Sequence, residues 1–108
     1  MALSKGIEFY YIAYGYEDDR QWENYVEDGN GGFCANRFYD FDKALKAAKA
    51  SHKAEIEYQQ DEYGYVGDDV MNTYVMVRHT RYSDYELAMI SGRRSKVKFF
   101  EYEDDDDE

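Results

Sequence analysis

Four stretches of the chain are rich in aromatic and aliphatic residues, which favour the pleated surface of a β-sheet. They predict strands over residues 7–16, 72–81, 85–90 and 96–102, and the polar residues 91–95 predict the turn between the last two. In the first stretch, successive side chains alternate between two faces, and both faces are apolar. This pattern indicates a central strand, or a sheet that has a partner on its outer face.

The clearest helix is predicted over residues 40–61, where an alanine-rich run from Ala44 to Ala50 favours the helical state. Asp40 stands at the N-cap position, and Gly64 and Gly67 end the segment. At about 100° per residue, six side chains share one largely apolar face: Phe41, Ala44, Leu45, Ala48, His52 and Ile56. We interpret the histidine on this face as a hydrogen-bonded core residue.

The segment from Asp18 to Tyr39 is compatible with two structures. The spacing of Trp22, Tyr25 and Val26 fits a short helix. The turn sequence Asp-Gly-Asn-Gly-Gly at 28–32, followed by a further aromatic stretch, fits a β-hairpin instead. We favour the hairpin.

The order of these elements predicts a small α+β fold with a single domain over residues 1–102. In this fold an antiparallel β-sheet of about five to six strands packs against one long α-helix. The chain length of 108 residues fits one domain. Residues 103–108 form an acidic tail, which we expect to be disordered.

Acidic residues outnumber basic ones by 24 to 13, which gives a net charge of −11. Seven acidic groups stand in the last eight residues, so residues 1–100 carry a net charge of −4. A broad basic face is needed to bind nucleic acid phosphates or an anionic membrane directly, so both partners are disfavoured. No apolar run approaches the roughly 20 residues of a transmembrane helix. A basic protein is the natural electrostatic partner.

The acidic residues are grouped in two blocks. Residues 8–28 contain seven carboxylates against Arg20 alone, and residues 55–69 contain six carboxylates without a Lys or Arg. Carboxylates recur about every 6.6 Å on a strand face and about every 5.4 Å on successive helical turns. Carboxylates from several elements could therefore imitate the phosphates of a nucleic acid, although a solvated surface with ordinary ion pairs is the simpler interpretation.

Tyrosine is unusually frequent, with 13 residues in the chain. Tyrosine and tryptophan are enriched in protein interfaces, and their rings can receive arginine side chains whose guanidinium pairs with a neighbouring carboxylate. Some tyrosines are ordinary sheet residues, and a homodimer interface would use others. The predicted partner-binding residues combine acidic groups with aromatic anchors: Tyr16, Glu17, Asp18, Asp19, Trp22, Asp61, Glu62, Tyr63, Tyr65, Asp68 and Asp69.

The sequence displays no catalytic set, and we expect neither a catalytic residue nor a bound metal or cofactor. The single cysteine, Cys34, excludes a disulfide framework and fits a reducing cytoplasm. The two histidines lack the close spacing of a zinc-binding pair.

These observations predict a non-enzymatic, cytoplasmic inhibitor that occupies the nucleic-acid-binding site of a basic protein or complex. In general character, the chain fits an anti-defence protein of the kind that a phage or mobile element carries. The alternative is a small-ligand or nucleotide-binding, sequestering oligomer. Its aromatic pocket would hold a ring, and an arginine would hold an anionic group. The candidate arginines are Arg78, Arg81, Arg93 and Arg94.

Overall fold

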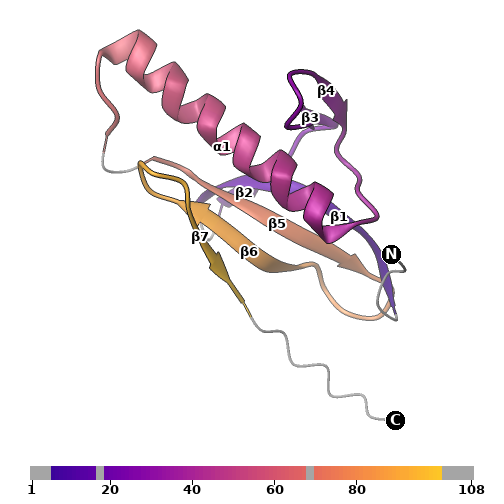
Figure 1. Cartoon of the computed structure of the whole chain (residues 1–108). Helices are drawn as coiled ribbons and strands as arrows, with labels where there is room; N and C mark the ends of the chain where they lie inside the picture. The colour runs from indigo at the N-terminus through magenta and orange to yellow at the C-terminus, as the bar shows by residue number, and fades with distance from the viewer. Residues whose placement is uncertain (1–5, 17–18, 68–69, 101–108) are drawn as a thin grey trace.

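The computed structural model describes residues 6–16, 19–67 and 70–100 of the chain (Figure 1). It confirms the predicted α+β fold, with one helix packed against a five-stranded antiparallel sheet and a separate two-stranded sheet. The elements in chain order are β1 (Ile7–Tyr16), β2 (Asp19–Gln21), β3 (Tyr25–Glu27), β4 (Phe33–Ala35), α1 (Phe41–Tyr63), β5 (Asn72–His79), β6 (Tyr85–Ser91) and β7 (Lys96–Phe99). The predicted acidic tail, residues 103–108, lies outside the described residues.

The strand β1 lies inside the five-stranded sheet, whose order is β2-β1-β5-β6-β7. Tyr10 and Ile12 of β1 are buried in the core beneath α1, whereas Tyr11 and Ala13 are buried on the opposite face. Both apolar faces of β1 are therefore buried, as the alternation predicted for a central strand. Of the last predicted strand, residues 96–99 form β7 and Phe100 follows it, whereas residues 101–102 lie outside the described residues.

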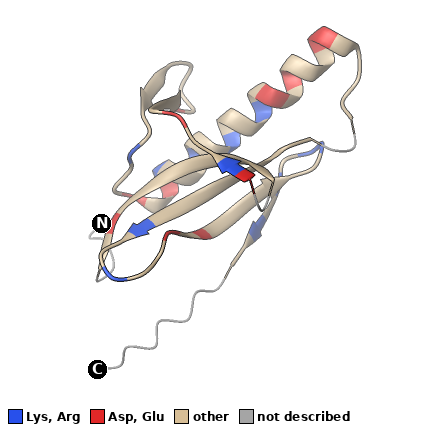
Figure 2. Cartoon of the chain, turned by 180° about the vertical axis from the view of Figure 1, so that it is seen from behind, with Lys and Arg blue, Asp and Glu red and all other residues tan. Residues whose placement is uncertain are grey.

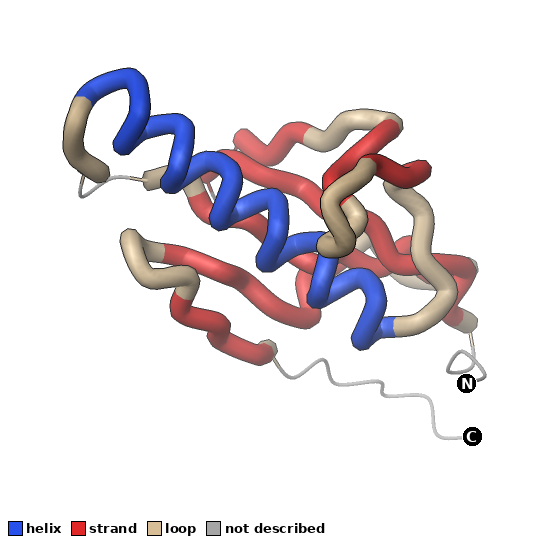
Figure 3. Tube along the Cα trace, turned by 45° about the horizontal axis from the view of Figure 1, so that its top comes forward, coloured by secondary structure: helices blue, strands red, loops and turns tan. Residues whose placement is uncertain are grey.

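The helix α1 begins and ends within two residues of its predicted bounds. Asp40 occupies the N-cap position, but its side chain forms no capping hydrogen bond. Gly64 closes the helix in the left-handed conformation, with φ of 78°, and its N–H bonds the carbonyl of Gln60. The buried residues of the helix end at His52, and the remaining turns extend past the sheet (Figures 1 and 3).

The segment after β2 forms the hairpin β3–β4, as we favoured. Asp28 Oδ1 accepts hydrogen bonds from the backbone N–H groups of Asn30, at 2.7 Å, and of Gly32, at 3.1 Å. These bonds lower the pKa of Asp28 and hold the turn. The hairpin lies on the same side of the sheet as α1, where Val26 and Cys34 pack against the core (Figure 3).

Asn36 ties this hairpin to the main sheet. Its buried side chain accepts a hydrogen bond from the N–H of Ile12, at 2.7 Å, and donates to the carbonyl of Ile12, at 2.9 Å. It also donates to the carbonyl of Glu23, at 2.7 Å. The hairpin therefore has a defined position relative to β1, and a space remains between the two.

The two faces of the sheet are covered differently. One face carries α1 and the hairpin, over a core built around Val75, Val77 and Ile90. On the other face no helix or strand of the described chain lies over the buried Tyr74 and Met76. Side chains of the strands themselves cover the buried residues of that face, and solvent reaches it at its edges.

Candidate functional site

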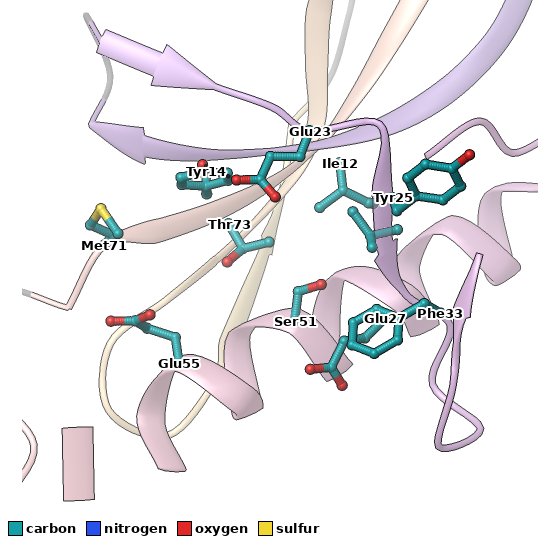
Figure 4. A pocket seen from close by; sticks show the side chains of 11 residues that line it. Ile12, Tyr14, Glu23, Tyr25, Glu27, Phe33, Ser51, Glu55, Met71 and Thr73 are labelled. Carbon is teal, nitrogen blue, oxygen red and sulfur yellow. Dashed lines mark hydrogen bonds between the residues drawn. The ribbon is translucent and has the colours of Figure 1, made fainter. Parts of the chain in front are cut away.

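A cleft of about 360 Å³ opens between β1, the hairpin β3–β4 and α1 (Figure 4). We call it the acidic cleft, because three carboxylates line it: Glu23, Glu27 and Glu55. Ile12 and Thr73 lie at its floor, on strands of the main sheet. The cleft thus combines an apolar interior with negative charge.

The three carboxylates come from separate elements and from both acidic blocks of the sequence. Glu23 lies just before β3, where its side chain accepts a hydrogen bond from the hydroxyl of Tyr14 at 3.1 Å. Glu27 ends β3, and Glu55 lies on α1, where the amide of Gln59 donates to it at 3.0 Å. Burial and then the hydrogen bond with Glu23 raise the pKa of Tyr14, so its hydroxyl stays a donor.

Of the residues that the structure describes, no Lys or Arg lines the acidic cleft. Two ion pairs lie outside the acidic cleft, between Arg20 and Glu86 and between Arg78 and Asp84. Glu27 also lines a second groove, which it shares with Lys46, Lys49 and Lys53 of α1. Glu23 and Glu55 are therefore the carboxylates most available to an external cation.

Aromatic rings stand at the mouth of the cleft. Tyr25 is 70% exposed and Phe33 is 74% exposed, and both line the cleft. A ring face beside a carboxylate attracts a guanidinium or ammonium group through its quadrupole as well as through charge. The arrangement can therefore hold a basic side chain of a partner, with its stem against the apolar floor.

The cysteine of the hairpin does not line the acidic cleft. Cys34 lies on the hairpin, where burial and then the charge of Asp28 raise the pKa of its thiol, which disfavours the reactive thiolate. Within residues 6–16, 19–67 and 70–100, no three His, Cys, Asp or Glu side chains cluster so as to hold a metal ion. The same part of the chain has no helix both long and apolar enough to cross a membrane.

The predicted partner-binding residues on α1 and after it lie together at the projecting end of the helix. Asp61 and Glu62 are exposed, and Tyr63 and Tyr65 are 61% and 68% exposed. Asp61 and Glu62 extend the negative charge of Glu55 along the helix. Figure 2 shows this end of α1 in red.

The predicted residues on β1 and β2 are divided between two places. Tyr16 and Asp19 are exposed and pair with each other across the two strands. Trp22 packs edge-on against Tyr11, with ring centroids 6.1 Å apart, on the face of the sheet away from α1. Four further predicted residues lie outside the described residues: Glu17, Asp18, Asp68 and Asp69.

The sequence pattern did not single out the residues that the acidic cleft unites. Glu23, Glu27 and Glu55 are members of the two acidic blocks, but nothing local shows that these blocks meet. Tyr25 was expected in the hairpin, and Phe33 began the aromatic stretch that follows the turn. The predicted hairpin was the available signal for this site, because its apolar residues had to pack against some part of the core.

Comparison with models of known protein families, with curated proteins and with solved structures found no match. The functional argument therefore rests on this chain's own residues. The acidic cleft and the projecting acidic end of α1 are the features that carry it.

The charges on α1 run against its dipole. Apart from Asp42 in the first turn, the lysines precede the carboxylates along the helix, as Figure 2 shows. A helix C-terminus carries partial negative charge, so Asp61 and Glu62 in the last turns are unfavourable there. We expect this arrangement to lower stability, while it leaves Asp61 and Glu62 exposed to solvent.

Replacing Asp61 or Glu62 by lysine is expected to stabilise the fold. Each change should raise the free energy of unfolding by about 0.5 kcal/mol, because the new charge complements the dipole. Urea denaturation at low ionic strength measures this effect. Asp42→Lys is the matched control in the first turn, and it should lower stability by a similar amount. A loss of stability on Asp61→Lys and Glu62→Lys would contradict the dipole argument.

Proposed function

We propose that this protein is a non-enzymatic, cytoplasmic binding protein that occupies the nucleic-acid-binding surface of a basic protein partner. The observation that carries the proposal is the meeting of both acidic blocks in one cleft that no described Lys or Arg lines. Exposed rings at its mouth and exposed carboxylates along α1 extend the same surface. An inhibitor carried by a phage or mobile element would have this character.

The chemistry of a phosphate-binding surface explains the choice of partner. Such a surface presents Arg and Lys side chains at spacings suited to phosphates. An arginine entering the acidic cleft would pair with Glu23 or Glu55 and stack on Tyr25 or Phe33. Further basic side chains would face Asp61 and Glu62 on the projecting helix.

The experiment begins with a tagged pull-down from bacterial lysate, eluted in steps of salt, to obtain the partner. The purified pair is then measured by surface plasmon resonance across a range of ionic strength and in the presence of DNA or RNA. The proposal expects affinity to fall steeply with salt and nucleic acid to compete for the partner. Binding that ignores salt and is not displaced by nucleic acid would contradict it.

A pair of charge-matched variants locates the surface. Glu23→Gln with Glu55→Gln is expected to slow association by about tenfold, because these carboxylates steer a basic partner. Glu8→Gln with Asp42→Asn removes the same charge from exposed positions that do not line the acidic cleft. This control should slow association by about twofold or less. Equal effects of the two pairs would show that total charge, and not the acidic cleft, determines binding.

A further inference from the structure

A second pocket, of about 260 Å³, lies at the edge of β1, on the face of the sheet away from α1. We call it the arginine pocket. Phe9 and Tyr11 of β1, Trp22 after β2, Arg37 after β4 and Arg78 of β5 are among its lining residues. Among residues 6–16, 19–67 and 70–100, no Asp or Glu lines it. In a chain of net charge −11, this combination of rings and arginines differs sharply from the rest of the surface.

Arg37 is available to a ligand. Its guanidinium lies over the ring of Phe9, 4.2 Å from the centroid, and this contact favours a defined position of the group. The residue is exposed, and its side chain forms no hydrogen bond or ion pair with any residue that the structure describes. A fork of N–H donors is thus presented beside an aromatic surface, which suits a phosphate or carboxylate.

Arg78 adds a second, partly balanced charge. Its Nε donates to Asp84 at 3.0 Å, and its guanidinium lies 5.6 Å from the centroid of Phe9. The side chain is 47% exposed. Because the bond to Asp84 uses Nε, the terminal nitrogens of Arg78 keep donors for an anion.

Trp22 supplies the stacking surface. It is 56% exposed and rests edge-on against Tyr11, so that its position is held while much of the indole faces solvent. Asn24, also exposed, lines the same pocket and offers an amide that can bond the edge of a ring. The amide of Asn36, by contrast, is used by Ile12 and Glu23.

We infer that the arginine pocket binds a small anion with one aromatic ring system, of the class of nucleoside monophosphates. The ring would stack on Trp22, and the phosphate would lie on Arg37 and Arg78. The pocket volume is just below the roughly 300 Å³ at which pockets for drug-sized ligands begin. A volume of this size suits a ligand that carries a single base. A long nucleic acid strand fits less well, because the net negative charge of the protein would repel every further phosphate. This site is independent of the proposed function, since it lies on the other face and has the opposite charge.

Trp22 is the single tryptophan of the chain, so its fluorescence reports on this pocket directly. The full chain is titrated with AMP, GMP, CMP and UMP, with excitation at 295 nm chosen as the red edge of indole absorption. Free N-acetyltryptophanamide under the same conditions corrects for absorption by the nucleotide. The inference expects saturable quenching for at least one nucleotide, and weaker binding of the matching nucleoside or of inorganic phosphate alone.

Arg37→Gln tests the assignment, and it is expected to weaken nucleotide binding about tenfold or more. Arg94→Gln makes the same charge change at an exposed position that does not line the arginine pocket, and it should leave binding unchanged. Circular dichroism and isothermal titration calorimetry confirm that each variant is folded and that the signal is binding. Quenching that never saturates, or equal loss in both variants, would overturn the inference. Tighter binding of a single-stranded oligonucleotide than of any mononucleotide would overturn the proposed ligand class.

Discussion

Replacing His52 by leucine is expected to lower the free energy of unfolding by about 3 kcal/mol. The imidazole is fully buried between α1 and the sheet, with Nδ1 3.1 Å from the hydroxyl of Thr73 and Nε2 2.9 Å from the carbonyl of Gly92. A carbonyl only accepts, so Nε2 carries a proton, and in the neutral ring Nδ1 then accepts from the threonine hydroxyl. Leucine fills a similar volume but leaves the threonine hydroxyl buried without this partner.

Urea denaturation followed by circular dichroism measures this loss. Thr73→Val removes only the hydroxyl, and it should cost about 1 kcal/mol because His52 keeps its bond to Gly92. In a double-mutant cycle the two changes should be less than additive, since both remove the same bond. A loss of less than 1 kcal/mol for His52→Leu would show that the two hydrogen bonds contribute little to stability.

Replacing Glu86 by glutamine is expected to lower the free energy of unfolding by about 2 kcal/mol. Arg20 lies across the open face of the sheet, with its guanidinium 2.9 Å from Glu86 and 4.4 Å from the ring centroid of Tyr74. Both charged side chains are only 22% exposed. Burial by itself would lower the pKa of Arg20, but the hydrogen bond and charge of Glu86 raise it overall. Without the carboxylate, a half-buried cation loses its partner.

The control for this prediction is a variant that removes both charges. Arg20→Met combined with Glu86→Leu should be closer to wild type than Glu86→Gln, because an apolar pair needs no counter-charge. Thermal and urea unfolding of the three variants give the comparison. A loss of less than 0.5 kcal/mol, as is typical of exposed pairs, would show that solvent screens this ion pair.

Local patterns in the sequence predicted the elements accurately where each pattern had a single physical meaning. The alanine-rich run and the glycine at position 64 bounded α1, because helix propensity and left-handed capping depend on neighbouring residues alone. The turn at 28–32 decided between helix and hairpin correctly, because Asp28 bonds within its own turn. The sequence predicted the N-cap position of Asp40 but not the absence of its capping hydrogen bond, because that bond depends on the side-chain rotamer as well as on position.

The candidate sites depended on information that no local pattern contains. Glu23 and Glu55 meet because Asn36 fastens the hairpin beside Ile12, on the side of the sheet that α1 covers. Arg37 and Trp22 line one pocket because each lies next to a segment that pairs with β1, Trp22 after β2 and Arg37 before Phe38. Both results require contacts between residues far apart in the sequence, whose pairing is decided by the packing of the whole core.

By itself the sequence determined the strands, the long helix, the excess of negative charge and its division into two blocks. These properties follow from side-chain chemistry and from periodicities of a few residues. Only the tertiary structure decided that the blocks share the acidic cleft and that the arginine pocket lies on the opposite face. The reason is physical: the order of strands and the placement of the hairpin are set by long-range burial and hydrogen bonding, which a one-dimensional pattern does not specify.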